Sequence, residues 1–319
     1  MAETKIGLIK SNVAKVMVGN EETVDLLLTC LLSGGHCLLE DVPGTGKTVM
    51  AKSIAKSIGG EFARIQFTPD LLPSDITGLY YYNKKEEEFI FRPGPAFANI
   101  ILGDELNRAT PRTQSALLEC MEEKQITIEG RTHELSEPFF VIATENPVES
   151  SGTFPLPEAQ LDRFLMRLSM EKPDRDNAMK ILKRFNNGDP LKALQPVCTP
   201  EDVLQMRKDV GDIYVDERIY DYILNIIDAT ARQAEVAVGA STRSSISLLH
   251  AAKAYAYVQG RTFVVPEDVK LLAPKVLAHR LLLNRSSRWK ADKAEEVVER
   301  ILRGAEVPTE DWKNASSEE

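Results

Sequence analysis

Residues 41–48 read DVPGTGKT and lie between a short apolar run and a helix-forming stretch. The apolar run, residues 36–40, predicts a buried strand, and residues 48–58 predict a helix that ends at a pair of glycines. A glycine-rich turn between a strand and a helix is the setting of a phosphate-binding loop. Asp41 replaces the first glycine of the usual G-x-x-x-x-G-K-[ST] pattern, at a position away from the amides that would be nearest the phosphates.

Four residues of this loop carry its chemistry. Gly44 and Gly46 let backbone N–H groups turn inward around phosphate oxygens. Lys47 supplies a positive charge for the outer phosphates, and the Thr48 hydroxyl supplies a Mg²⁺ ligand. The start of the following helix adds a favourable partial positive charge. The loop therefore predicts a nucleotide triphosphate bound with magnesium.

A second motif places two carboxylates after a predicted strand. Residues 100–102 are apolar, and we expect them to form a buried strand. Asp104 and Glu105 come 57 and 58 residues after the loop lysine. Asp104 is placed for a contact with Mg²⁺, and Glu105 for orienting a water molecule toward the terminal phosphate. Downstream of a phosphate loop, this pair predicts nucleotide hydrolysis.

Strand-length apolar runs alternate with helical stretches in the first half of the chain. Residues 62–67 and 139–143 add two strands, which predicts an α/β fold with a parallel sheet between helices. Two hairpins interrupt the alternation, at 80–91 and at 125–135. Helical periodicity dominates afterwards, over 203–210, 219–234, 244–258 and 267–283. We expect an α/β core over 1–172, a smaller all-α lid domain over 173–313 and a polar tail over 314–319.

Composition excludes several classes of protein. The chain has 319 residues, and none of its apolar runs approaches the ~20 residues of a membrane-spanning helix. The net charge of −9 opposes the positive field on which sequence-independent nucleic-acid binding relies. The four cysteines are scattered and form no metal or redox pair. We expect a reduced, cytoplasmic protein that neither spans a membrane nor binds nucleic acid.

Three stretches resemble the MoxR-type AAA+ ATPases. They are DELNRA at 104–109, TQSALLE at 113–119 and PLPEAQLDRF at 155–164. The resemblance runs from about Val18 through the helical domain. It implies a P-loop AAA+ core followed by a helical lid, with the two hairpins as the inserts typical of this clade.

The resemblance also implies roles for residues outside the two motifs. Asn146 matches sensor 1, which bonds the γ-phosphate or the attacking water, and Glu145 stands beside it where the family usually has Gln. Arg163 matches the arginine finger that one subunit supplies to its neighbour, and Arg243 matches sensor 2, whether in cis or in trans. The implied nucleotide-binding residues are Val18, Gly19, Pro43, Gly44, Thr45, Gly46, Lys47, Thr48, Val49 and Asp104.

The family resemblance implies a Mg²⁺-dependent ATPase that works as a homo-oligomeric, hexameric ring. Its implied clients are von Willebrand factor A-domain proteins, on which it acts as a chaperone-like remodelling or metal-insertion motor. Two alternatives stay open. The first is a chelatase-type subunit or a nucleic-acid motor of the same clade, and Lys84 and Lys85 on the first hairpin favour the nucleic-acid motor. The second is a scaffold that binds ATP without hydrolysing it.

Overall fold

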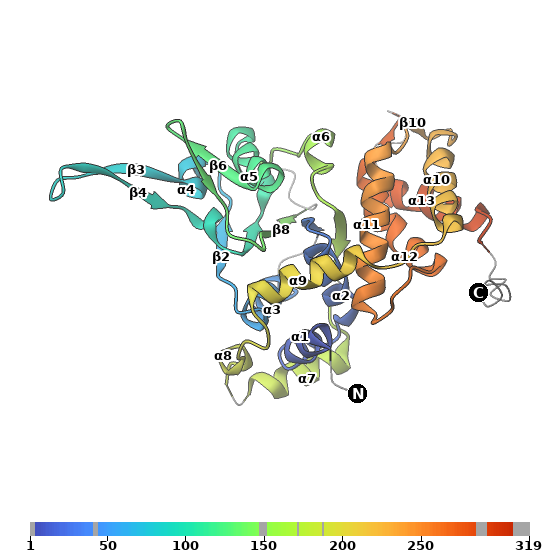
Figure 1. Ribbon diagram of the computed structural model, residues 1–319, viewed down its shortest axis with the longest axis horizontal. Coiled ribbons are helices and arrows are strands. Elements are labelled where there is room, and N and C mark those ends of the chain that lie inside the picture. The colour runs from blue at the N-terminus through green and yellow to red at the C-terminus, as the bar shows by residue number, and fades with distance from the viewer. Residues whose placement is uncertain are drawn as a thin grey trace, which may run out of the picture. The chain divides into compact units, whose positions relative to one another are not determined.

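The computed structural model describes residues 4–40, 44–146, 152–170, 172–186, 188–284 and 292–308. The chain divides into two compact units, Met1–Gly211 and Asp212–Glu319. The first is built on a central sheet and the second is mainly helical (Figure 1).

A five-stranded sheet forms the centre of the first unit, in the order β2-β5-β8-β1-β9 with every neighbouring pair parallel. Its strands are β1 (Cys37–Glu40), β2 (Phe62–Gln66), β5 (Ile100–Asp104), β8 (Phe140–Glu145) and β9 (Met166–Ser169). β1, β5 and β8 are almost entirely buried, which explains their continuous apolar sequences. The predicted α/β fold with a parallel sheet is confirmed.

The edge strand β9 was not predicted from the sequence. Met166 and Leu168 are buried, but Arg167 interrupts the apolar pattern between them. Its guanidinium pairs with the Glu40 carboxylate on the neighbouring strand at 3.3 Å, with its side chain only 13% exposed. A charged residue inside a short strand is tolerated here because a partner on the adjacent strand compensates its burial.

Helices flank this sheet, as expected. Among the described residues before Gln125, the four longer helices are α1 (Lys5–Ala14), α2 (Glu21–Leu32), α3 (Lys47–Ser57) and α5 (Pro111–Glu123). The side chains of α2 are buried from Leu26 to Leu32, which places this helix in the core. The unit also contains the short helices α4 (Pro73–Thr77) and α6 (Glu158–Leu161), and 3₁₀ turns at Pro95–Phe97 and Leu106–Arg108.

Both predicted hairpins are present. β3 (Gly78–Asn83) and β4 (Glu88–Pro93) form an arm that projects from the first unit (Figure 1). Gly78 and Gly94 meet at its root, where a Cβ on Gly78 would collide with the carbonyl oxygen of Arg92 and one on Gly94 with that of Ile76. The arm therefore starts at a backbone crossing that admits no side chain.

The second hairpin joins β6 (Gln125–Ile128) to β7 (Arg131–Glu134). It turns at Glu129 and Gly130, both with positive φ, as two-residue hairpin turns require. His133 on β7 stacks on Phe91 of the arm with ring centroids 4.3 Å apart, and Tyr80 Oη lies 3.1 Å from His133 Nε2. The two hairpins thus pack against each other.

The helices α7 (Arg175–Phe185), α8 (Pro190–Ala193) and α9 (Pro200–Gly211) follow the last strand. They belong to the first compact unit, which runs to Gly211. Arg184 of α7, for example, donates to the carbonyl oxygens of Ala14 and Met17 at 2.7 and 3.0 Å. The segment after residue 172 is helical, as expected, although its first three helices pack with the α/β core. The domain boundary at 172 stays a prediction.

The described residues of the second unit form four long helices: α10 (Glu217–Ala231), α11 (Thr242–Val258), α12 (Pro266–Leu277) and α13 (Asp292–Gly304). The helix expected over 267–283 is shorter than predicted. It ends at Leu277, and after the 3₁₀ turn Ala278–Arg280 the strand β11 (Leu282–Leu283) pairs with β10 (Val236–Val238). A short apolar run fits a helix and a strand equally well, so periodicity does not reveal this ladder. The predicted tail, 314–319, lies outside the described residues.

The hydropathy of the described helices agrees with the composition. None of them combines the length and the apolar character that crossing a bilayer requires. All four cysteines are free and buried.

Candidate functional site

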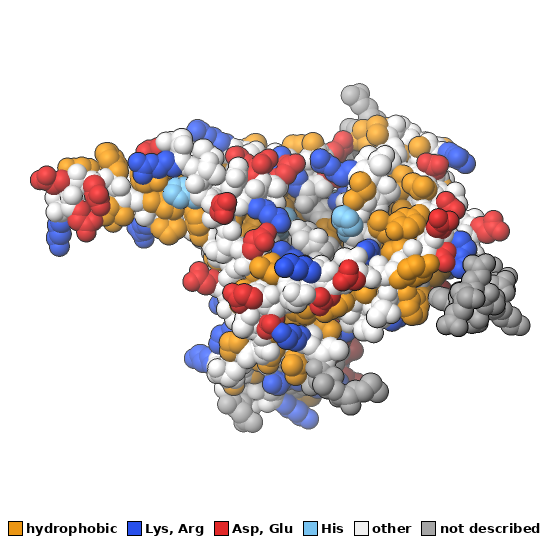
Figure 2. Space-filling view, viewed as in Figure 1, with side chains coloured by type: hydrophobic (Ala, Val, Ile, Leu, Met, Phe, Trp, Pro, Cys, Tyr) orange, Lys and Arg blue, Asp and Glu red, His pale blue; other side chains and the backbone are white. Residues whose placement is uncertain are grey.

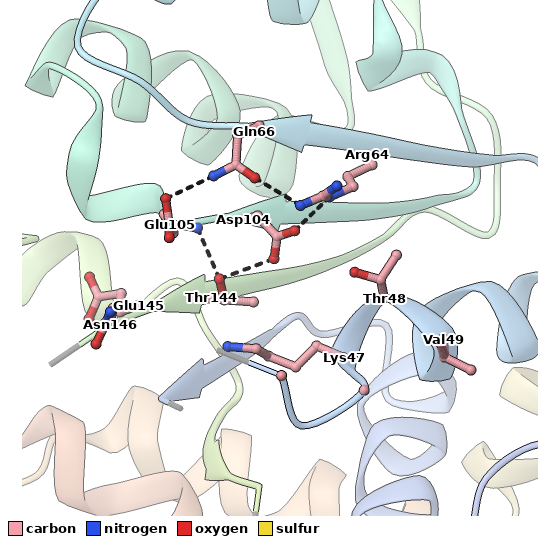
Figure 3. Close-up of a pocket in the computed structure, with 12 residues that line it drawn as sticks. Lys47, Thr48, Val49, Arg64, Gln66, Asp104, Glu105, Thr144, Glu145 and Asn146 are labelled. Carbon is pink, nitrogen blue, oxygen red and sulfur yellow. Dashed lines mark hydrogen bonds and ion pairs between the residues drawn. The ribbon is translucent and has the colours of Figure 1, made fainter. Parts of the chain in front are cut away.

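A cleft of about 380 Å³ lies at the carboxyl ends of the central strands. Figure 3 shows its side chains, which come from the start of α3 and from the ends of β2, β5 and β8. Ligand sites of open α/β sheets lie at this end of the strands. The lining residues are Gly44, Gly46, Lys47, Thr48, Val49, Arg64, Gln66, Asp104, Glu105, Thr144, Glu145 and Asn146.

The loop after β1 has the backbone that its glycines predict. Gly44 and Gly46 have φ values of +97° and +93°, in the left-handed region that favours glycine. Gly46 caps α3, whose first residue is Lys47, so the N–H groups of the helix start face the cleft end of the sheet. Thr45 is buried. Pro43 lies outside the described residues.

The two carboxylates of the second motif stand where β5 ends. Asp104 is its last residue, and Glu105 follows with φ +59°, a left-handed conformation that non-glycine residues seldom adopt. The Glu105 N–H donates to Thr144 Oγ1 at 2.9 Å, and that hydroxyl lies 3.3 Å from Asp104 Oδ1. Thr144 therefore links the two acidic residues to β8.

The site also contains two side chains of β2 that were not predicted from the sequence. Arg64 Nε donates to Asp104 Oδ2 at 2.6 Å, and its other branch donates to Gln66 Oε1 at 2.9 Å. Gln66 Nε2 in turn donates to Glu105 Oε2 at 2.9 Å, as the dashed lines in Figure 3 show. Arg64 and Gln66 could have been found because they lie at the end of a predicted strand, and that strand pairs with the strand that carries the carboxylates.

Asn146, the predicted sensor 1, follows β8 directly and lines the same cleft. It is 9% exposed. Its neighbour Glu145 is half-buried and pairs in register with Glu40 of β1. Burial, and secondarily the charge of Glu40, raise the pKa of Glu145 to about 7, while Arg167 acts in the opposite direction. An uncommon acid at this position is thus partly protonated at neutral pH.

The segment that contains Val18 and Gly19, two of the residues implied to bind the nucleotide, adjoins the phosphate loop. A Cβ on Gly46 would lie 3.7 Å from Cε of Met17, the residue that precedes Val18 and Gly19. Val18 is buried, and Gly19 has φ +76° with Asn177 of α7 packed against its backbone. The neighbourhood suits the predicted role, which stays a prediction for both residues.

Arg163, the predicted arginine finger, does not line this cleft. It lines a second cleft of about 400 Å³ together with residues of α5 and β6. Its guanidinium pairs there with Glu122 at 2.9 Å, and the two side chains are 32% and 43% exposed. The other lining residues are Ser115, Leu118, Glu119, Glu123, Gln125, Thr127 and Gln160.

Arg243, the predicted sensor 2, belongs to the second unit. It is the second residue of α11, directly after the N-terminal residues Ser241 and Thr242, and is exposed. The Ser241 N–H donates to Ser244 Oγ at 3.3 Å, which caps the start of this helix. Its role stays a prediction.

The donors of the first cleft fit a nucleotide triphosphate with a hard divalent cation. Mg²⁺ takes oxygen ligands and is held by one or two protein groups together with phosphates and water. Thr48 and Asp104 offer such oxygens, and Lys47 with the loop N–H groups offers complementary charge for phosphates. Among the described residues no group of three or more His, Cys, Asp or Glu side chains is placed to hold a metal by itself.

A parallel α/β sheet with a phosphate loop after β1 and an Asp-Glu pair after β5 defines a P-loop nucleotide-binding protein. Comparison with known proteins defines the family. Residues 36–166 match the ATPase family associated with various cellular activities (AAA), and residues 228–301 match the AAA lid domain.

Relatives of full length match as well. Chaperone MoxR1 of Mycobacterium tuberculosis is 39% identical over 305 residues, which cover 93% of this chain and 80% of that protein. The uncharacterized protein YeaC of Bacillus subtilis is 47% identical over 96% of this chain and 95% of its own. A crystal structure from Cytophaga hutchinsonii, described as a candidate ATPase, has a TM-score of 0.88 at 40% identity and covers 96% of this chain and 95% of its own. The chain belongs to the MoxR family of AAA+ ATPases.

Proposed function

We propose that this protein hydrolyses ATP in a Mg²⁺-dependent reaction and uses the turnover to remodel a protein client. The observation that carries the proposal is the meeting of Lys47, Asp104 and Glu105 in one cleft at the carboxyl ends of the strands. A loop that binds phosphates and two acids that can serve a metal ion and a water are the parts that phosphoryl transfer requires.

The residues divide the reaction among them. Lys47 and the N–H groups at the start of α3 bind the β- and γ-phosphates, and Thr48 and Asp104 hold the metal ion. Bound Mg²⁺ supplies charge neutralisation on the phosphate oxygens. Glu105 orients the attacking water, and Asn146 donates to the γ-phosphate or to that water. Val18, Gly19, Pro43, Thr45 and Val49 complete the nucleotide site.

The position of Arg163 supports action between subunits. It stands in a different cleft from Lys47 and is held by Glu122 there, so it does not serve its own subunit's phosphates in this arrangement. A guanidinium from a neighbouring subunit that reaches the γ-phosphate would complete the site, which makes hydrolysis dependent on assembly. The assembly proposed is a homo-oligomeric, hexameric ring, with Arg243 as sensor 2.

The client proposed is a protein with a von Willebrand factor A domain, remodelled in the cytoplasm by a chaperone-like or metal-insertion action. Two observations support a chaperone-like action: the relative named chaperone MoxR1, and the arm of β3 and β4, whose exposed aromatic side chains offer a contact surface. The von Willebrand factor A class itself follows from the family resemblance. Retention of such a protein by the Glu105→Gln chain with ATP, and its loss from a Lys47→Ala chain, is the expected result of a pull-down. Equal retention by both chains would contradict nucleotide-controlled binding.

The substitution Glu105→Gln tests the activity itself. Gln keeps the size of the side chain but cannot orient water as a base, so we expect at least a ~100-fold loss of phosphate release with ATP binding retained. Phosphate release and binding of fluorescent ATP are the measurements. Glu86→Gln, in the exposed turn of the arm, is the matched control and keeps both properties. Wild-type chain that binds ATP at concentrations supporting oligomers and releases no phosphate would instead be a nucleotide-gated scaffold.

A further inference from the structure

Asp104 is fully engaged by the chain's own side chains. Its Oδ2 accepts from Arg64 Nε at 2.6 Å, and its Oδ1 lies 3.3 Å from the Thr144 hydroxyl. The Asp104 side chain is only 11% exposed, so its ionised form needs a compensating charge nearby. The Arg64 guanidinium, 2.6 Å from Oδ2, supplies such a charge.

Arg64 is able to leave. It comes from β2, which has β5 as its only neighbour in the described sheet, and its side chain is 49% exposed, in contrast to the buried carboxylate that it contacts. Figure 3 shows its guanidinium above Asp104, on the side of the cleft where Thr48 also lies. A long side chain at an edge has many rotamers and a solvated alternative. The Arg64 side chain thus has a solvated alternative that the buried Asp104 carboxylate lacks.

We infer that Arg64 is a positioning residue of the nucleotide site that holds Asp104 in place and competes with the divalent cation for it. The inference rests on the proposed function, in which Asp104 serves a magnesium ion. Arg64 must release Oδ2 before that oxygen takes part in binding a metal ion or its water. Release also frees Gln66, because Arg64 and Gln66 are bonded to each other at 2.9 Å.

The substitution Arg64→Gln tests this competition. The readout is the Mg²⁺ concentration that half-saturates binding of a fluorescent ADP to the full chain, measured without hydrolysis. Removal of a competing cation lowers this concentration, and we expect a shift of about two- to fivefold because the pair is partly screened by solvent. Arg64→Met repeats the test with a side chain that cannot replace the lost hydrogen bond.

Arg108→Gln is the matched control. Arg108 Nη1 donates to Glu105 Oε2 at 2.9 Å, so this variant removes the same charge from the residue next to Asp104 and leaves the contact between Arg64 and Asp104 in place. If simple loss of positive charge controlled Mg²⁺ binding, both variants would shift equally, and that result overturns the inference. An unchanged or raised half-saturating concentration in both Arg64 variants overturns it too.

A second measurement needs no nucleotide. In the Arg64→Gln variant, the buried Asp104 carboxylate lacks the charge of Arg64. Millimolar Mg²⁺ alone is therefore expected to raise the midpoint of thermal unfolding of this variant more than that of wild type. Equal shifts contradict the inference. Wild-type chain that binds no ADP at any Mg²⁺ concentration would count against the proposed function instead, which separates the two failures.

Discussion

The nucleotide cleft and the arm of β3 and β4 belong to the same unit but are built in opposite ways. In the cleft, the chemically important side chains follow buried strands and are held by named neighbours, as Asp104 is by Arg64 and Thr144. In the arm, two strands pair only with each other, and Phe89 and Tyr82 are 65% and 51% exposed. Figure 2 shows hydrophobic side chains along the arm and charged ones near its tip.

The difference shows two uses of the same elements. Parallel strands covered on both faces fix side chains at their ends, which suits chemistry that depends on distances of a few tenths of an ångström. A solvent-exposed antiparallel ribbon offers apolar area at little cost to the fold, which suits contact with another protein. Substitutions in the cleft should therefore change rates, and substitutions in the outer arm should change neither rate nor stability.

The largest expected effect comes from Arg163→Ala. Removal of a guanidinium that stabilises the transferred phosphoryl group lowers hydrolysis by about 10³-fold or more. If the arginine acts on the neighbour's nucleotide, mixing this variant with Lys47→Ala chains restores part of the activity, because some interfaces then pair an intact loop with an intact arginine. Phosphate release from the mixed and the separate proteins is the measurement.

Arg112→Ala, which removes an exposed arginine from α5, serves as its control and keeps wild-type hydrolysis. Absence of any complementation in mixtures that do assemble would remove the role between subunits. It would also make the second cleft a local feature of one chain.

A smaller effect concerns the scaffold under the cleft. His36 Nδ1 accepts from the Val141 N–H of β8 at 3.0 Å, and Nε2 donates to the Met121 carbonyl at 3.1 Å, which is the neutral form. Burial lowers the pKa of His36 to about 4, and the Met121 carbonyl acts in the opposite direction. The unfolded chain takes up this proton near its ordinary value of 6.5, and the folded chain only near 4.

The free energy of unfolding is therefore expected to fall by about 3 kcal/mol on this account as the pH falls from 6.5 to 4. Glu145 acts in the opposite sense, since its raised pKa favours the folded state as pH falls through 7 toward 4.5. Comparison of wild type with His36→Gln, by urea unfolding at each pH, isolates the histidine. Parallel curves for the two proteins would contradict the neutral, buried assignment.

The smallest expected effects concern two phenylalanines of the arm, Phe91 in its inner part near the second hairpin and Phe89 in its outer part. Phe91 contacts His133, Tyr80 and Phe97, with ring centroids 4.3, 5.3 and 5.5 Å away, whereas the ring contact described for Phe89 is with Tyr82. We expect Phe91→Ala to cost about 1–2 kcal/mol of unfolding free energy and Phe89→Ala less than about 0.5 kcal/mol. Basal hydrolysis stays within about twofold in both. A cost for Phe89→Ala as large as that for Phe91→Ala would show that the outer arm is covered.

Much of the cleft could be predicted because its determinants are local in sequence. Their spacing in the sequence predicts the left-handed glycines at 44 and 46 and the acids after β5. Because strand ends in a parallel sheet meet at one edge, these residues are expected to lie together. Gly130 likewise indicated the turn of the second hairpin. The buried strands β1, β5 and β8 were visible as uninterrupted apolar runs.

The remainder depends on contacts between distant segments. Arg64 and Gln66 join the site only because β2 lies beside β5, and Arg167 is tolerated in β9 because its guanidinium pairs with Glu40 of the adjacent strand. The ladder between β10 and β11 joins segments more than 40 residues apart, and its apolar residues fit a helix as well. Pairing of this kind is not encoded in the periodicity of either segment.

The glycine crossing at the root of the arm has a mechanical consequence. Because Gly78 and Gly94 lie backbone against backbone, the two ends of the ribbon are held together at its root, and we expect the ribbon to tilt as one piece. A six-residue strand is roughly 20 Å long, so a tilt of about 6° at the base carries the tip by about 2 Å. A rearrangement of ångström size in the body would thus reach whatever the tip touches at full amplitude, rather than being absorbed on the way.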